Sequence, residues 1–175
     1  MSLTFRPATP SDTSSVLALV ESAYRGDSSR KGWTTEADFF GGSRIDAAGV
    51  LAKITAPDGA VLLGFDDSDD ALVVCAEVLR RGPGVVYFGM FAVDPLRQGG
   101  GIGRLALERV EAFVRDEWEA RSLEMSVIMC RDELIAYYVR RGFRLMDETR
   151  PFPYGEVAGK ILRDDLYFSV LSKEL

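Results

Sequence analysis

The chain has 175 residues and a formal net charge of −6, from 21 basic and 27 acidic residues. This length allows one domain with a sizeable core that needs no disulfide and no metal. An acidic balance without a basic stripe argues against a nucleic-acid partner, and a sequence without histidine excludes imidazole bases and His-ligated metals. We therefore expect no metal site, and chemistry that depends on carboxylates, tyrosine, backbone amides or a cofactor.

Two further features bear on location. No apolar run reaches the roughly 18 residues that span a bilayer, and the first ten residues lack a signal-peptide pattern. Cys75 and Cys130 lie in apolar, strand-like runs, which favours reduced thiols in a core. These observations predict a cytoplasmic protein that does not bind membranes.

The first half of the chain predicts one strand, three helices and a hairpin. Thr9, Pro10 and Asp12 have the order of a helix start, and a helical apolar period follows them. The hairpin turn "DDSDD" lacks the ligand spacing of a calcium loop, so we interpret it as solvated. The expected elements are a strand Leu3–Arg6, a helix that ends near Gly26, a short helix that begins near Thr34 or Thr35, a helix Asp46–Ala56, and strands Ala60–Phe65 and Ala71–Leu79.

The second half predicts alternating strands and helices around a run of glycines. We expect strands at Val85–Val93, Leu123–Cys130, Phe143–Met146 and Leu166–Leu171. We also expect helices from Ile102 to about Trp118 and from Leu134 to Arg141, and a proline-stiffened loop, "RPFPYGEVAG". Neither a linker nor an internal repeat divides the chain. We therefore expect a single α/β domain over residues 1–175 with a mixed sheet.

The stretch "DPLRQGGGIGR", which we call the glycine corner (residues 94–104), joins a predicted strand to a predicted helix N-terminus. Such a corner binds anions, because its backbone N–H groups and the helix dipole face the ligand. A nucleotide phosphate loop is disfavoured, since Gly-Lys-Ser/Thr is missing. A dinucleotide fingerprint at Gly101, Gly103 and Ala106, or a tight turn without a ligand, are the weaker alternatives.

Two segments carry a family resemblance. "FAVDPLRQGGGIGRLALE" resembles the acetyl-CoA-binding motif of the GNAT acetyltransferases at Gln98, Gly101 and Gly103, and "ELIAYYVRRGFR" resembles a later segment of that family at Tyr138 and the Gly142-Phe143 pair. The segments have the family's order and separation. The resemblance implies a mostly antiparallel sheet of about six to seven strands flanked by helices, with a V-shaped cofactor cleft after Val85–Val93.

For function, the resemblance implies an acetyl-CoA-dependent N-acetyltransferase that acetylates a primary amine of a small molecule, by direct attack in a ternary complex. The residues implied to bind the cofactor are Phe91, Ala92, Val93, Gln98, Gly99, Gly100, Gly101, Ile102, Gly103, Arg104, Arg131 and Tyr138. Gly99 and Gly100 fill variable positions of the motif and look replaceable. Arg131 stands where the family often has Asn, and an arginine there could face the phosphates. A protein or peptide acetyltransferase and a non-catalytic acyl-CoA sensor are the alternatives.

The resemblance also suggests the catalytic groups. It implies that Tyr138 is the general acid for the departing thiolate, against the alternative of a core aromatic residue. The predicted strand Val85–Val93 carries no acid, so Glu77 on the preceding strand is the candidate general base. A surface role for Glu77, a water chain, or an amine that is already neutral remain open.

The acceptor is expected between the N-terminal helices and the proline-aromatic loop. Aromatic and charged residues stand together there, and the candidate substrate residues are Trp33, Glu36, Arg44, Arg150 and Phe152. Aromatic rings would form an apolar wall while Arg44 or Arg150 holds a carboxylate, which suggests an amino-acid-like amine. Ordinary helix packing is the alternative for Trp33. The protein is expected to be a monomer or a homodimer.

Overall fold

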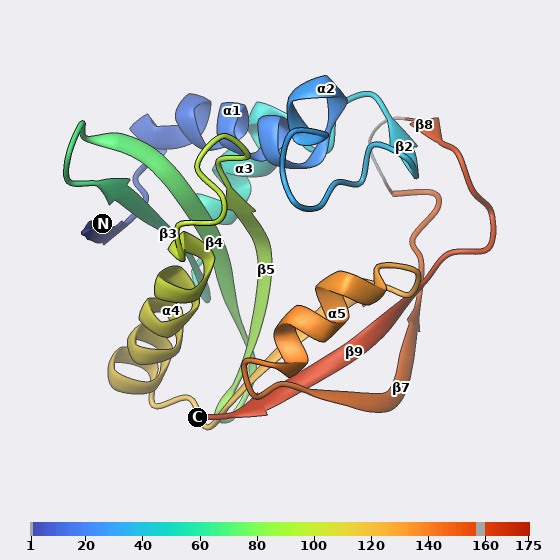
Figure 1. Cartoon of the computed structure of the whole chain (residues 1–175). Coiled ribbons are helices and arrows are strands. Elements are labelled where there is room, and N and C mark those ends of the chain that lie inside the picture. Colours follow the sequence, from blue (N-terminus) through green and yellow to red (C-terminus); the bar gives the residue numbers. More distant parts are fainter. Residues whose placement is uncertain (1, 157–159) are drawn as a thin grey trace.

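A computed structural model describes residues 2–156 and 160–175 (Figure 1). The helices are η1 (Pro10–Asp12), α1 (Thr13–Tyr24), α2 (Gly26–Ser29), α3 (Ala47–Ile54), α4 (Ile102–Trp118) and α5 (Asp132–Val139). The strands are β1 (Leu3–Pro7), β2 (Phe40–Gly41), β3 (Gly59–Asp66), β4 (Ala71–Gly82), β5 (Val85–Val93), β6 (Ser122–Ile128), β7 (Arg144–Pro151), β8 (Lys160–Ile161) and β9 (Tyr167–Glu174).

Seven strands form one sheet in the order β1-β3-β4-β5-β6-β9-β7. Every neighbouring pair is antiparallel except β5 and β6, which run parallel. The short strands β2 and β8 pair separately. This arrangement confirms the expected mixed sheet of mostly antiparallel strands flanked by helices.

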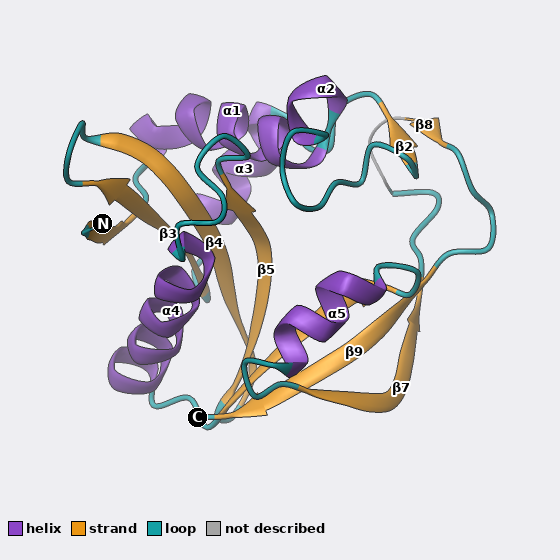
Figure 2. Cartoon of the chain, in the orientation of Figure 1, coloured by secondary structure: helices purple, strands orange, loops and turns teal. Residues whose placement is uncertain are grey.

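The helices cover both faces of the sheet (Figure 2). On one face, α1 and α3 pack against strand residues that include Val61 and Leu63. On the other face, α4 and α5 pack against a set that includes Leu62. Successive residues of a strand therefore enter opposite cores, as the pleat requires, and both faces are buried.

A bulge in β5 reverses the faces of that strand at its middle. Phe88 packs in the core under α4 and α5, but Met90, two residues later, packs in the core under α1 and α3. The register changes at the same point, because one extra residue of β5 lies between the pairs Glu77–Gly89 and Cys75–Ala92. Met90 has a φ of +42°, which a residue with a side chain rarely adopts.

The two parallel strands then separate. Only Val85–Tyr87 of β5 pairs with β6, at Ser122–Glu124. Beyond that point β5 stays with β4 as far as Val93, and β6 stays with β9 as far as Ile128. The sheet therefore opens between the C-terminal halves of β5 and β6, which confirms the expected V-shaped cleft.

The main departure from the sequence prediction lies between α2 and α3. The short helix expected near Thr34 or Thr35 is wrong, since this segment forms turns that lead into β2. The Thr35 hydroxyl bonds the Ser29 hydroxyl and accepts from the Ala37 amide at 3.0 Å, local bonds that compete with a helix. No helix in the described part of the chain combines the length and apolarity needed to cross a membrane.

Candidate active site

Three adjoining cavities follow the opening between β5 and β6. The corner cavity, about 420 Å³, lies between the glycine corner and α5. The distal cavity, about 760 Å³, lies near Glu77 and Phe152. A smaller space of about 130 Å³, which we call the throat, has walls in common with both. It shares Tyr24, Phe91, Arg131, Leu134 and Tyr138 with the corner cavity, and Glu36, Arg44, Tyr87, Met90, Ile128 and Phe168 with the distal cavity.

The corner cavity is suited to an anion. Among the described residues that line it are four arginines, Arg104, Arg131, Arg140 and Arg141, and no carboxylate. The first backbone amides of α4 follow Gly101, and in a helix these groups have no intrahelical partner. Positive side chains, free amides and the helix dipole therefore act on the same space.

The glycines of the corner have different roles. Gly99 and Gly101 have φ values of +92° and +82°, a region that costs other residues strain, whereas Gly100 does not have a positive φ. A Cβ on Gly103 would lie 2.8 Å from the Tyr137 hydroxyl. The sequence suggested that Gly99 and Gly100 are replaceable, and the backbone supports this only for Gly100.

Tyr138 lies in the last turn of α5, where burial leaves it 4% exposed. Its ring meets Phe88 and Phe143 edge-on, with centroids 6.4 and 5.6 Å away, and it lines both the corner cavity and the throat. Burial is the main reason that the pKa of its phenol is raised well above 10. Tyr138 is therefore both a core residue and part of the wall of two cavities, and its phenol stays protonated at ordinary pH.

The candidate base lies farther along the path. Glu77 is 7% exposed, lines the distal cavity and accepts from Lys53 Nζ at 2.8 and 2.9 Å. It does not line the throat that Tyr138 borders. The carboxylate is therefore beside the distal cavity and already has a cationic partner.

The candidate acceptor residues separate into three groups. Glu36, Arg44 and Phe152 line the distal cavity together. Trp33 lines the corner cavity and packs on Tyr137 with ring centroids 5.3 Å apart. Arg150 lines none of the three cavities, because it pairs with Glu124 and Glu148. The structure therefore brings Arg44 to the distal cavity and leaves Arg150 outside it.

Glu36 is the centre of a buried cluster, the arginine cluster, that sequence reasoning found only in part. Its carboxylate accepts from Arg25 Nη1 at 2.6 Å, from Arg44 Nε at 3.4 Å and from Arg131 Nη1 at 3.1 Å. Burial alone raises a carboxyl pKa, but the charges of the three arginines hold the pKa of Glu36 below its usual value. Arg131 Nη2 also donates to the Thr34 hydroxyl at 2.6 Å. Glu36 is thus a fixed anion and a poor base.

Comparison with known proteins shows which family the chain belongs to. The model of the acetyltransferase (GNAT) family matches residues 20–143. The chain belongs to the GNAT family. It is accordingly an acyltransferase whose cofactor is acetyl-CoA. No curated protein sequence gives a match.

Solved structures of GNAT proteins have the same fold at low sequence identity. A nourseothricin acetyltransferase is 19% identical with a TM-score of 0.69, over 99% of each chain. A GNAT acetyltransferase from Elizabethkingia anophelis, with acetyl-CoA bound, is 15% identical with a TM-score of 0.65, over 99% of this chain and 98% of that one. The spermidine/spermine N-acetyltransferase SpeG from Vibrio cholerae is 13% identical with a TM-score of 0.67, over 98% and 92%.

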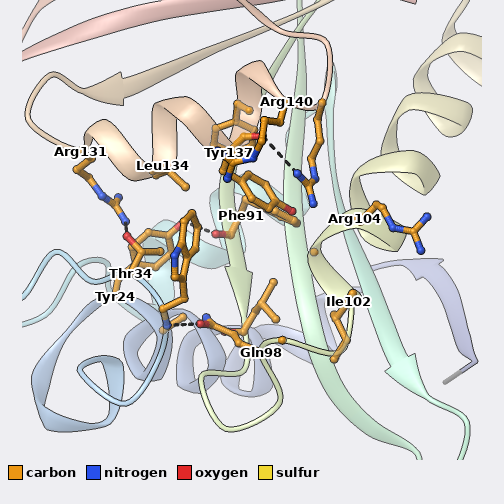
Figure 3. Close-up of a pocket in the computed structure, with 18 residues that line it drawn as sticks. Tyr24, Thr34, Phe91, Gln98, Ile102, Arg104, Arg131, Leu134, Tyr137 and Arg140 are labelled. Atoms are coloured by element: carbon orange, nitrogen blue, oxygen red, sulfur yellow. Dashed lines mark hydrogen bonds between the residues drawn. The ribbon is translucent and has the colours of Figure 1, made fainter.

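The corner cavity of this GNAT protein fits the family's cofactor. Ten of the twelve residues expected to bind it line the cavity, namely Phe91, Val93, Gln98, Gly99, Gly101, Ile102, Gly103, Arg104, Arg131 and Tyr138 (Figure 3). Ala92 and Gly100 do not line it, and the Ala92 side chain is buried in the core under α1 and α3. Arg104 pairs with Glu108 at 3.0 Å and Arg131 with Glu36 at 3.1 Å, whereas Arg140 and Arg141 have no carboxylate partner among the described residues and match the phosphate charges of the ligand.

Two arginines near the corner cavity are paired with carboxylates of the protein. Arg97, which flanks the corner, pairs with Asp66 and Asp69 at 2.9 and 2.5 Å and so ties the corner to the turn between β3 and β4. Arg131 points toward Thr34 and Glu36, and Figure 3 shows it across the cavity from Arg104. The Arg131 guanidinium is therefore engaged at the end of the cavity that meets the throat.

Tyr24 lines the candidate site of this GNAT protein, a position that the sequence did not reveal. Its hydroxyl donates to the Phe91 carbonyl oxygen, and its ring lines both the corner cavity and the throat. Burial is the main cause that raises the pKa of its phenol to about 12. Tyr24 continues the apolar face of α1, so the helical periodicity of the sequence alone predicts a core residue.

Proposed function

We propose that this acetyltransferase moves the acetyl group of acetyl-CoA to a primary amine of a small molecule, by direct attack while both are bound. The observation that carries the proposal is the adjoining series of cavities. The throat has walls in common with the cofactor's cavity and with the distal cavity, and Tyr138 borders the throat. Nourseothricin and spermidine, named for two structural neighbours, are small molecules, which supports the same class of acceptor.

The residues of the corner would hold the cofactor. Bound acetyl-CoA supplies the activated thioester. The amides that open α4, with Arg140 and Arg141, would bind phosphate oxygens in the corner cavity. Arg104 also lines the cavity, but its guanidinium pairs with Glu108 at 3.0 Å. Beyond Tyr87, the edge of β5 is no longer paired with β6. The Phe91 and Val93 carbonyl oxygens there already accept from Tyr24 and Gln98, and the remaining backbone groups of this edge would bind an extended ligand and a developing oxyanion.

Proton transfer would use two separate groups. Tyr138 holds its phenolic proton because of burial, and at the edge of the throat it would give that proton to the leaving thiolate. Glu77 lines the distal cavity and would take the proton of the incoming amine. Glu36 is unsuited to that task, because three guanidinium groups stabilise its charged form.

The test is free-thiol release from acetyl-CoA against a panel of small amines and a short peptide, with identification of the acetylated product. We expect release with small amines and little with the peptide. Thermal unfolding with and without CoA separates the alternatives. Stabilisation by CoA without thiol release from any amine would instead support a sensor, and preferred acetylation of the peptide would support a protein acetyltransferase.

A further inference from the structure

We propose that the acceptor amine carries a carboxylate, and that Arg44, supported by Arg25, binds that carboxylate at the junction of the throat and the distal cavity. This inference rests on the proposed function, which it makes more specific. It assigns to the arginine cluster the recognition of an acidic amine, and predicts that polyamines and simple alkylamines are poor acceptors.

The arginine cluster carries more positive than negative charge. The cluster holds three guanidinium groups and one carboxylate, and so has two more positive than negative charges. Arg25 and Arg131 are only 6% and 8% exposed. Buried charges are normally paired, since desolvation without compensation is costly. Both Arg25 Nε and Arg131 Nε are also buried without an acceptor among the described residues. The cluster is therefore short of negative partners.

The Arg44 guanidinium has donor groups that are open to a ligand. Its Nε contacts Glu36 at 3.4 Å, and within the described part of the chain its two Nη groups make no hydrogen bond. The side chain is 26% exposed and lines both the throat and the distal cavity. Its guanidinium carbon lies 4.0 Å from the centroid of the Tyr24 ring, a cation–π contact that helps to hold the group in place. The open end of this fork has the geometry for two parallel bonds to a carboxylate.

Arg44 and Tyr138 line the same small throat. A carboxylate on Arg44 would therefore leave the amine of the same molecule near Tyr138. The rest of the distal cavity is lined by Lys53 and Arg81 and by three carboxylates, Asp46, Glu77 and Glu156, so the surplus of positive charge belongs to the arginine cluster. A second ammonium group placed at the throat would meet that surplus.

The experiment compares matched acceptors. Several amino acids, including phenylalanine and leucine, are each assayed beside the amine that lacks only the carboxylate. A charge-assisted hydrogen bond is worth about 1.5–3 kcal/mol, so kcat/KM should favour the amino acid by about tenfold to a hundredfold. Arg44→Gln should lower this ratio about tenfold or more. Arg109→Gln, which removes an exposed arginine of α4, is the matched control and should keep the ratio.

A binding measurement does not depend on turnover. The 2-hydroxy analogues of the same amino acids should raise the Tm of the CoA complex in the wild type, and should do so much less in Arg44→Gln. The CoA-induced shift itself shows that the variant is folded, and Arg44→Lys, which keeps the charge, gives a second variant. Equal rates for amino acids and alkylamines, or a shift independent of Arg44, would overturn the inference. Absence of thiol release from every amine would count against the proposed function and leave the binding test decisive.

Discussion

The Trp33 amide donates a hydrogen bond to Gln98 Oε1 at 2.5 Å. Gln98 Nε2 donates in turn to the Val93 carbonyl oxygen at 3.3 Å, at the end of β5. One side chain thereby joins the glycine corner to the segment that carries Thr34 and Glu36, and that segment reaches Arg131 on the far side of the cleft. The glycine corner and the arginine cluster are held together through these bonds.

Loss of the Gln98 hydrogen bonds should weaken the binding of both acetyl-CoA and the amine. In Gln98→Ala the Trp33 amide and the Val93 carbonyl lose their partner, at a cost of about 1 kcal/mol, which is roughly fivefold in binding. We expect the KM for acetyl-CoA and the KM for the amine to rise together. Initial rates with each substrate varied in turn measure this. A change confined to acetyl-CoA would show that Gln98 acts on the cofactor alone.

The glycine corner gives a graded prediction. Gly99→Ala and Gly101→Ala place a side chain at a positive φ, which costs about 1–2 kcal/mol and lowers Tm by about 2–8 °C. Gly101→Ala should also raise the KM for acetyl-CoA, since Gly101 precedes the first amides of α4. Gly100→Ala is the matched control and should be close to the wild type. Equal losses in all three variants would contradict the assignment.

Tyr138→Phe tests the proton donor. The ring packing is kept, so we expect a nearly unchanged Tm and a kcat about a hundredfold lower. The acid works in its protonated form, and a pKa raised well above 10 keeps it protonated at neutral and mildly alkaline pH. Wild-type kcat should therefore show no loss from this group below about pH 10. Tyr137→Phe is the neighbouring control, and an unchanged Tyr138→Phe profile would refute the role.

Glu77→Gln tests the proposed base. A base matters most where the amine is still protonated, so the variant should lose rate mainly at low pH and approach the wild type at high pH. Lys53→Met, which removes the ion-pair partner at 2.8 Å, separates charge pairing from proton transfer. If Glu77 only pairs with Lys53, both variants should lose stability similarly and keep the shape of the pH profile.

Glu36→Gln tests the arginine cluster through stability. Within residues 2–156 and 160–175, Glu36 is the one carboxylate that pairs with these three guanidinium groups, so its removal leaves buried positive charge at a cost of about 3 kcal/mol. The folded-state pKa of Glu36 is depressed, so its contribution is complete above its unfolded pKa of about 4.3 and is lost as the pH falls through the folded value. Chemical denaturation at pH 7 and pH 3 should show a deficit that shrinks at the lower pH. A deficit that does not change with pH would mean that packing, not charge, decides stability.

The sequence predicted best the part of the fold that two local motifs mark. The bounds of β5 and α4 agree with those expected, because strand, glycines and helix follow one another without a gap. The β5 bulge could not be seen, since residues 86, 88, 90 and 92 are all buried and the alternation continues through it. The folded structure shows that the faces change, through the register with β4 and through the different cores that Phe88 and Met90 enter.

The acceptor side was predicted less well because its contacts are not local. Glu36 meets Arg25 and Arg131 from 11 and 95 positions away, and no periodicity in the sequence encodes such pairs. Arg44 and Arg150 both stand near aromatic residues in the sequence, so neither could be preferred. The pairing of Arg150 on β7 with Glu124 on β6, across the intervening strand β9, is what separates them.

A structure of the protein with CoA tests the central claim most directly. The account predicts the pyrophosphate on the first amides of α4, the pantetheine arm along the edge of β5 beyond Tyr87, and the thiol at the throat beside Tyr138. A thiol that ends away from the throat, or phosphates bound outside the corner cavity, would contradict it.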